Sequence, residues 1–305
     1  AQYNPSARFG ADFTTTQQYD NTDNYTIMSV SDYIQDEMFL DSQGDEWPEN
    51  FDVRQKWPLC ASLHEVPKMG LCRTSSILIS PSVMSDRICI ASNGTIQPRI
   101  SPQDLLENCD DCGKCMTETS PSPAFVHWQR VGLVTGGPYG SGEGCRPFKI
   151  RPNCAQPCRQ SYDHIDWMMN DCVCSNELYD GKYEEDKYYA QSLVTFKHPT
   201  HDTIRAIKRE LFTRGPVVGC FDLHQSFDLY SRGIYRPQTV EPDALIGSFC
   251  GKMIGWGVQH RSAYWTVVNA WGKQWGENGL IRLSMTVPNE VVSGWPVVRQ
   301  HFRET

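Results

Sequence analysis

The spacing of hydrophobic and polar positions changes from helical to strand-like along the chain. Helical spacing marks "SPQDLLENC", with Ser101 and Pro102 suited to the N-cap and the first helical position. It also marks "PAFVHWQRVG" and "HDTIRAIKRELFTRG", which end at Gly132 and Gly215. Alternation and β-branched residues then predict strands over 216–223, 251–259, 263–272 and 279–285. This order predicts an α+β fold with two lobes that meet at a cleft.

The N-terminal segment has a different character from the rest. Residues 1–46 are polar and contain no cysteine, and only Tyr25–Phe39 has the apolar spacing of a short amphipathic helix. Aromatic residues and the first cysteine appear from Trp47 onward. We therefore expect an arm over 1–46, similar to a pro-segment, and a folded domain over 47–305. Tyr25–Phe39 is the expected anchor of the arm, either docked in the cleft of that domain or packed elsewhere, on the domain or on a partner chain.

Composition narrows the function classes. The chain has 305 residues, with 28 Lys and Arg against 36 Asp and Glu, so its net charge is −8. That acidic balance argues against a nucleic-acid-binding protein. No run of about 18 apolar residues exists, which argues against a membrane-spanning helix.

Cysteine content points to an oxidising compartment. The chain has 13 cysteines, and this number favours disulfides in a secreted or luminal protein. The close spacing of Cys109, Cys112 and Cys115 is also compatible with zinc ligands, but no compact set of His and Cys partners follows. Two N-glycosylation sequons, at Asn24 and Asn93, agree with the oxidising compartment.

Several ordered motifs resemble one family, the papain-like cysteine peptidases, and most closely its cathepsin B branch. They run from Trp47 to the C-terminus and include "FDVRQKWPLC", "MSDRICI", "GLVTGGPYGSGEGCRPF", "RGPVVGCF" and "YWTVVNAWGKQWGENG". The resemblance implies a helical left lobe and a β-barrel-like right lobe, with the active site between them.

The chemistry of this family uses a Cys nucleophile, a His base, an Asn that orients the His, and a Gln that donates to the oxyanion. Counting from "MSDRICI" places Ser75 at the nucleophile position and Met69 at that of the Gln. Counting from "GWG" places Phe249 at the His, while Asn269 in "VVNAWG" matches the Asn. Three of the four positions therefore lack the family's chemistry, and His260, in an expected turn, is not a replacement.

The helix that follows the nucleophile position also departs from the family. Pro81 lies within it, in "SPSVMSDRICI". Ser80 and Pro81 suit a new N-cap and first helical residue, so the helix either begins late or continues through a kink at Pro81.

Substrate-binding segments differ as well. The family's C-N-G-G loop reads "CMTETSPSP" from Cys115, and the lost glycines make close backbone approach harder. The occluding loop of cathepsin B carries a His pair that grips a C-terminal carboxylate. Here Ala155 and Gln156 occupy the matching region, and His164 is an isolated loop residue, so dipeptide removal is not implied.

The resemblance also implies four disulfides: Cys60–Cys89, Cys72–Cys115, Cys109–Cys112 and Cys145–Cys174. Cys220 and Cys250 stand at positions that line the family's S2 pocket, and they are either a fifth disulfide or two buried thiols. Cys154, Cys158 and Cys172 remain, which leaves one unpaired cysteine by parity.

Together these features predict a non-catalytic cathepsin B-like protein, secreted or in the endo-lysosomal lumen, that needs no cofactor or metal. Its role would be binding or structure, as a subunit of a larger complex, a decoy for peptidase inhibitors, or a matrix protein. A protein partner is expected, and a nucleic-acid partner is not. The alternative is a rewired hydrolase that uses Ser75, for which the sequence shows no general base.

Overall fold

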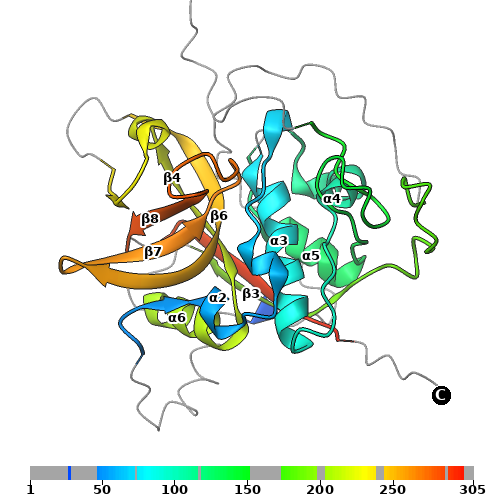
Figure 1. The fold of residues 1–305 in the computed structure, drawn as a ribbon, viewed down its shortest axis with the longest axis horizontal. Coiled ribbons are helices and arrows are strands. Elements are labelled where there is room, and N and C mark those ends of the chain that lie inside the picture. Colours follow the sequence, from blue (N-terminus) through cyan, green and yellow to red (C-terminus); the bar gives the residue numbers. More distant parts are fainter. Residues whose placement is uncertain are drawn as a thin grey trace, which may run out of the picture.

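The computed structural model describes residues 27–28, 47–72, 74–115, 118–151, 173–197, 203–237, 244–285 and 288–298. Within these ranges, a lobe built on helices lies beside a lobe built on a sheet (Figure 1). The long helix α3, Ser75–Ala91, lies where the two lobes meet (Figure 1). The α+β expectation is confirmed.

Two shorter helices accompany α3 in the helical lobe, α4 (Pro102–Asn108) and α5 (Ser122–Arg130). The Oγ of Ser101 accepts a hydrogen bond from the backbone N–H of Asp104 at 2.9 Å, so Ser101 is the N-cap of α4 as predicted. After α5, Gly132 adopts a φ of 79° and its N–H donates to the His127 carbonyl at 3.1 Å. Glycine adopts this backbone conformation without strain, which explains why the chain turns there.

The sheet of the other lobe has the strand order β1-β3-β9-β4-β6-β7-β8-β5, and β2 pairs with β6 outside this path. The strands are Ile27–Met28 (β1), Phe51–Asp52 (β2), Ala190–Lys197 (β3), Val217–His224 (β4), Ile234–Tyr235 (β5), Leu245–Gln259 (β6), Ser262–Val268 (β7), Leu280–Ser284 (β8) and Glu290–Pro296 (β9). Helix α3 packs on β4, β6 and β9 and so joins the lobes.

Helices α2 (Val53–Lys56) and α6 (Thr203–Arg214) both pack against β6, on the lower side of the sheet in Figure 1. Helix α6 ends before Gly215, which has a φ of 98°, as the sequence predicts. The described residues also include short 3₁₀ helices at Ala61–His64, Gly70–Cys72, Asp110–Cys112 and Gln225–Leu229. None of the helices in the described ranges is long and apolar enough to cross a membrane.

Helix α3 begins at Ser75 and continues through Pro81, so the late start at Ser80 is wrong. Nearly every residue of α3 is buried, and these tertiary contacts outweigh the local preference of proline for a first turn. The Oγ of Ser85 donates to the Pro81 carbonyl at 2.7 Å and accepts from the Ile100 N–H at 2.9 Å.

In the N-terminal arm, Ile27 and Met28 form strand β1 and not part of a helix. They pair in parallel with Leu193 and Val194 of β3, at the end of the sheet. An edge strand offers unpaired backbone groups to any extended segment, which a sequence pattern does not reveal. The rest of the expected helix over Tyr25–Phe39 lies outside the described residues.

Five disulfides crosslink the described chain. They are Cys60–Cys89, Cys72–Cys115, Cys109–Cys112, Cys145–Cys174 and Cys220–Cys250. The first four are the pairs that the family resemblance implies. Cys220 and Cys250 form the fifth disulfide and are not two buried thiols. Because Cys109, Cys112 and Cys115 are all bonded to other cysteines, the zinc interpretation of their spacing is wrong. Cys154, Cys158 and Cys172 lie outside the described residues.

Candidate functional site

The four positions assigned by resemblance lie close to the junction of the lobes, and all four are buried. The relative exposures are 7% for Met69, 2% for Ser75, 4% for Phe249 and 0% for Asn269. The N–H of Met69 donates to the Ala270 carbonyl at 2.9 Å, which holds Met69 beside the segment of Asn269. The first turn of α3 meets strand β6 next to Phe249. The structure therefore brings these segments together from distant parts of the sequence.

Both hydrogen-bonding directions of the Ser75 hydroxyl are occupied. Its Oγ accepts from the N–H of Cys250 at 2.8 Å and donates to Oε2 of Glu118 at 2.9 Å. One lone pair of the hydroxyl stays unused, but Ser75 is only 2% exposed, and a nucleophilic hydroxyl must be open to its substrate. In this conformation Ser75 is a buried link between α3, strand β6 and the loop that carries Glu118.

Glu118 covers the N-terminus of α3. Its Oε2 accepts from the N–H of Ser75 at 2.7 Å, and its Oε1 accepts from the N–H of Ser76 at 2.9 Å. The N-cap residue Thr74 makes no capping bond with its own side chain. Glu118 therefore satisfies two of the amides that a helix start leaves open, from a loop outside the helix.

The environment of Glu118 is almost closed to water. Burial raises the pKa of its carboxyl, while the hydrogen bonds from Ser75 and Ser76 act in the opposite direction. No Lys or Arg of the described chain forms an ion pair with Glu118. The carboxylate is stabilised mainly by the N–H groups and the positive end of the α3 dipole.

Two devices hold the Glu118 loop in place. The Cys72–Cys115 disulfide ties the loop to the segment just before α3, and the Thr74 Oγ1 donates to the Lys114 carbonyl at 3.1 Å. Glu118 was not among the residues singled out from the sequence. The available signal was an acidic residue three positions after a cysteine whose partner precedes the helix.

The same loop is also anchored to the sheet. The hydroxyls of Ser120 and Ser122 donate to Oε1 of Glu290, at 2.9 and 2.6 Å. Glu290 is the first residue of β9 and is 5% exposed. The loop from 118 to 122 therefore spans from α3 to β9, across the boundary of the two lobes.

Phe249 belongs to a buried group of aromatic rings. Its ring centroid lies 5.7 Å from that of Phe221 and 4.5 Å from that of Phe227. Phe227 in turn lies 5.4 Å from Trp271 and 5.2 Å from Trp275. A ring at position 249 accepts no proton, and this packing makes its surroundings apolar.

Asn269 keeps an incomplete set of hydrogen bonds. Its Oδ1 accepts from the Ala270 N–H at 2.7 Å, but its Nδ2 has no hydrogen-bond partner among the described residues, although it is fully buried. A buried amide donor without a partner costs free energy, so it calls for an explanation. Phe249, at the position that the resemblance assigns to the family's His, offers no acceptor to this amide.

The Cys220–Cys250 disulfide lies next to Phe249, since Cys250 follows Phe249 in strand β6. The two cysteines are register partners on β4 and β6, with Cα atoms 4.0 Å apart and no exposure to solvent. The N–H of Cys250 is also the group that donates to Ser75. The disulfide therefore fixes the part of β6 that packs on the start of α3.

The other residues singled out from the sequence are not part of this site or lie outside the described residues. His260 is exposed in the turn between β6 and β7, as expected. Asn93 is exposed in the turn after α3. Asn24, Ala155, Gln156 and His164 lie outside the described residues. In the described part of the chain, no cluster of three His, Cys, Asp or Glu residues is arranged to hold a metal ion.

Comparisons with known proteins identify relatives of this chain. Residues 47–293 match the family model described as papain family cysteine protease. The chain is 34% identical over 244 residues to cathepsin B-like cysteine proteinase 6 of Caenorhabditis elegans, a match covering 77% of the chain and 62% of that protein. It is 32% identical over 259 residues to the cathepsin B-like cysteine proteinase of Schistosoma japonicum, with 82% of the chain and 73% of that protein covered. The chain thus spans less than two thirds of the first relative.

Solved structures give the same result. Procathepsin B S9 of Trypanosoma congolense aligns with a TM-score of 0.65 and 26% identity, covering 84% of this chain and 80% of that one. Procathepsin L2 of Tenebrio molitor aligns with a TM-score of 0.58 and 18% identity, over 82% and 69% of the two chains, and supports the fold alone.

Proposed function

Because the chain belongs to the papain family of cysteine proteases and its relatives are cathepsin B-like, we propose that it is a member of this family without peptidase activity. By the family resemblance, Ser75 replaces the Cys nucleophile, Phe249 replaces the His base and Met69 replaces the Gln that donates to the oxyanion. The missing thiolate and base remove the mechanism of the family, and loss of one oxyanion donor alone typically costs about 10²–10³ in rate.

The main support for this proposal is that Glu118 and strand β6 bury the Ser75 hydroxyl and form hydrogen bonds with it. Peptide hydrolysis needs an open space near 3 Å from both the nucleophile and the oxyanion donors. Here the Glu118 carboxylate lies against Ser75 Oγ and against two N–H groups at the start of α3. It occupies the space in which a substrate carbonyl would have to lie.

A second candidate is a hydrolase that uses Ser75 with Glu118 as its base. The 2.9 Å contact between Ser75 Oγ and Glu118 Oε2 favours it, because a carboxylate at this distance can accept the hydroxyl proton. Two facts weigh against it. Ser75 is only 2% exposed, and Glu118 blocks the amides that would stabilise an oxyanion.

Covalent labelling separates the two candidates. The purified chain would be treated with a fluorophosphonate, which reacts with activated serines, and with an epoxide directed at papain-like thiolates, and then measured by intact mass. We expect no adduct with either reagent at pH 5 or pH 7. Stoichiometric fluorophosphonate labelling that is lost in both Ser75→Ala and Glu118→Gln would establish the Ser75 hydrolase.

The biological role that fits is binding. We propose that residues 47–305 act as a recognition domain in a secreted or luminal protein, with residues 1–46 as an arm. Disulfides and the exposed sequon at Asn93 support an oxidising compartment and glycosylation. A protein partner, such as a peptidase inhibitor or the subunits of a larger complex, would be identified by mass spectrometry of the native protein after purification. Recovery of the native protein as a monomer without any companion would contradict a stable complex.

A further inference from the structure

A cavity of about 420 Å³ lies against the middle of α3. One wall is formed by Leu78, Pro81 and Ser82 of α3 and another by residues 65–68. Ser75, Glu118 and Phe249 do not line it. Its volume lies within the range of about 300–1,000 Å³ that is typical of small-molecule sites.

The walls of this cavity are mostly apolar and rigid. Leu78, Ile100 and Phe148 line it and are 7%, 3% and 4% exposed. Four prolines, at positions 67, 81, 102 and 138, also line it. Proline fixes φ, so a wall of this composition is preformed and loses little entropy when a ligand binds.

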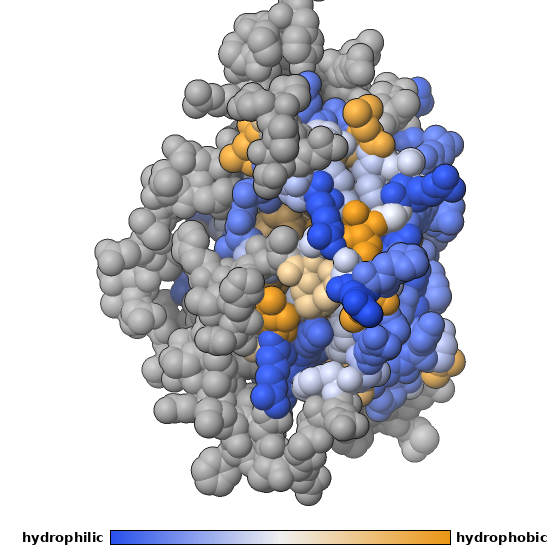
Figure 2. Space-filling model, turned by 90° about the vertical axis from the view of Figure 1, so that its left-hand side faces the viewer, coloured by the Kyte–Doolittle hydropathy of each residue, from blue (hydrophilic) through white to orange (hydrophobic). Residues whose placement is uncertain are grey.

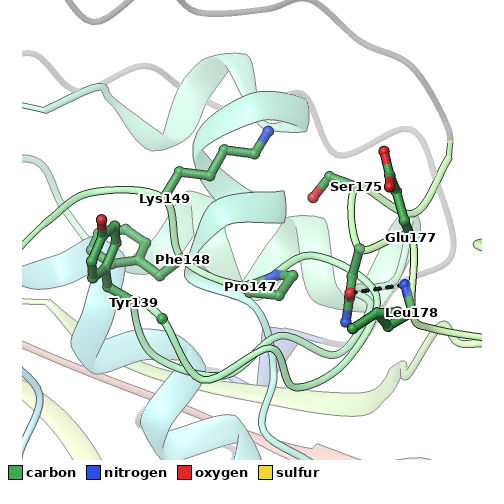
Figure 3. Close-up of a pocket in the computed structure, with 9 residues that line it drawn as sticks. Tyr139, Pro147, Phe148, Lys149, Ser175, Glu177 and Leu178 are labelled. Atoms are coloured by element: carbon green, nitrogen blue, oxygen red, sulfur yellow. Dashed lines mark hydrogen bonds between the residues drawn. The ribbon is translucent and has the colours of Figure 1, made fainter.

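Aromatic side chains close one end. Phe148 and Tyr139, both labelled in Figure 3, line both this cavity and the open hollow drawn there. The Tyr139 hydroxyl accepts from Nε of Arg151 at 3.2 Å, and the Arg151 guanidinium lies 5.7 Å from the Tyr139 ring centroid. These contacts hold the Tyr139 ring in position at the cavity rim.

The charges at this cavity are not balanced. Lys68 and Lys273 line it, and neither ammonium group makes an ion pair or hydrogen bond with a described residue. Arg99 also lines it, but Glu65 and Glu143 neutralise its guanidinium. Lys252, behind the wall, donates to Ser62 O at 3.2 Å and Ser82 Oγ at 3.0 Å and is paired with Asp86. The three cations and these two glutamates together carry a net charge of +1, and the Lys68 and Lys273 ammonium groups have no acidic partner among the described residues, in a protein whose net charge is −8.

From this combination we propose that the cavity binds a small amphipathic carboxylate, such as a medium-chain aliphatic or an aromatic acid. The apolar body lies against Leu78, Pro81 and Phe148, and the carboxylate lies at Lys68 and Lys273. A single carboxylate suits this site better than a phosphate, because taking a doubly charged group into a mostly apolar cavity costs more desolvation. The proposal does not depend on whether Ser75 is catalytic.

The first test compares three ten-carbon probes by isothermal titration calorimetry with the full chain: decanoate, decanol and decyltrimethylammonium. We expect decanoate to bind, decanol to bind about tenfold more weakly and the cation to show no binding, since a charge-assisted hydrogen bond contributes roughly this factor. Equal affinity for decanoate and decanol would overturn the proposal, because the two lysines would then play no part.

The second test removes the charges. The double variant Lys68→Gln/Lys273→Gln should lose decanoate affinity by about tenfold or more. The control Lys182→Gln/Arg232→Gln changes the net charge by the same amount at exposed positions and should bind decanoate as the unaltered protein does. An equal loss in both variants would show a general charge effect and contradict the site.

A measurement on the unaltered protein locates the ligand independently of any variant. Hydrogen exchange with and without decanoate should slow in segments 62–68 and 136–139, and not at the start of α3. Protection confined to other segments would overturn the assignment of this cavity.

Discussion

Buried charges at the two halves of helix α3 are compensated in different ways. At its start, Glu118 approaches from a loop, is held by two backbone N–H groups and the Ser75 hydroxyl, and pairs with no described cation. Farther along, the neighbours Asp86 and Arg87 each meet an opposite charge, with Asp86 2.9 Å from Lys252 and Arg87 2.7 Å from Glu210.

Arg87 shows what the compensated half of α3 does. Its guanidinium also donates to the carbonyls of Pro216 at 2.7 Å and Gly215 and Gly294 at 3.2 Å. These bonds tie α3 to the end of α6 and to strand β9. The second half of α3 therefore connects the two lobes. The start of α3 is covered by the Glu118 carboxylate, which has hydrogen bonds but no ion-pair partner among the described residues, and it should tolerate change better.

The surface of the sheet lobe gives no argument for a binding site. Among the described residues on the face in Figure 2, hydrophobic side chains form small groups separated by hydrophilic ones. Leu229, Leu245 and Val258 are exposed singly in this lobe. Scattered exposed apolar residues are common on soluble proteins and carry no argument for a partner.

The largest expected loss of stability comes from removing the Arg87–Glu210 ion pair, which connects the two lobes. Arg87→Met should lower the free energy of unfolding by about 3–5 kcal/mol, because Glu210 would remain buried without its main partner. Urea denaturation followed by tryptophan fluorescence measures this change. The double variant Arg87→Met/Glu210→Met should recover part of the loss, since no unpaired charge remains. A single-variant loss below about 1 kcal/mol would show that the pair does not hold the lobes together.

Removing the carboxylate at the start of α3 should cost less. Glu118→Ala leaves the amides of Ser75 and Ser76 buried without acceptors, for a loss of about 1–3 kcal/mol in the same urea experiment. The exposed Glu177→Ala is the matched control and should be nearly neutral. A loss as large as that of Arg87→Met would remove the difference between the two halves of the helix.

Ser75→Ala tests the third member of this contact. The variant leaves the Cys250 N–H without an acceptor and takes one donor from Glu118, so we expect a loss of about 1 kcal/mol. Combined with Glu118→Ala, the effect should be less than the sum, because the two side chains share one hydrogen bond. Strict additivity would indicate that they do not interact in solution.

The smallest effect is a dependence on pH. Burial raises the folded-state pKa of Glu118 above the ordinary carboxyl value of 4.5, so the folded state binds a proton more tightly than the unfolded state does. Between 4.5 and the raised pKa, stability then increases as pH falls, and the penalty for the ionised form is complete above the raised pKa. The stability lost in Glu118→Gln should therefore be larger at pH 5 than at pH 7. A loss that grows with pH would mean that the helix amides lower this pKa.

Local signals in the sequence predicted some elements well. Ser101 and Pro102 predict the start of α4, and Gly132 and Gly215 predict the ends of α5 and α6, because capping depends on neighbouring residues. Strands β4, β6, β7 and β8 also follow from their alternation. Strands β1, β3 and β9 were not predicted, since their pairing joins segments far apart in the chain.

The candidate site shows the same limit. Met69, Ser75, Phe249 and Asn269 were found by matching motifs, and the structure places them near the junction of the lobes. Glu118 was missed because its role depends on a disulfide that carries its loop to the start of α3. The continuation of α3 through Pro81 was open in the sequence, since burial of the whole helix decides it.

Hydrolysis of a fluorogenic peptide library by the purified chain, measured side by side with Ser75→Ala from the same expression host, tests the central claim most directly. Since Ser75 is enclosed and Phe249 accepts no proton, we predict that both proteins show the same background rate at pH 5 and pH 7, and that Ser75→Cys adds nothing to it. Turnover by the unaltered chain that disappears in Ser75→Ala, in material free of other peptidases, would contradict the account.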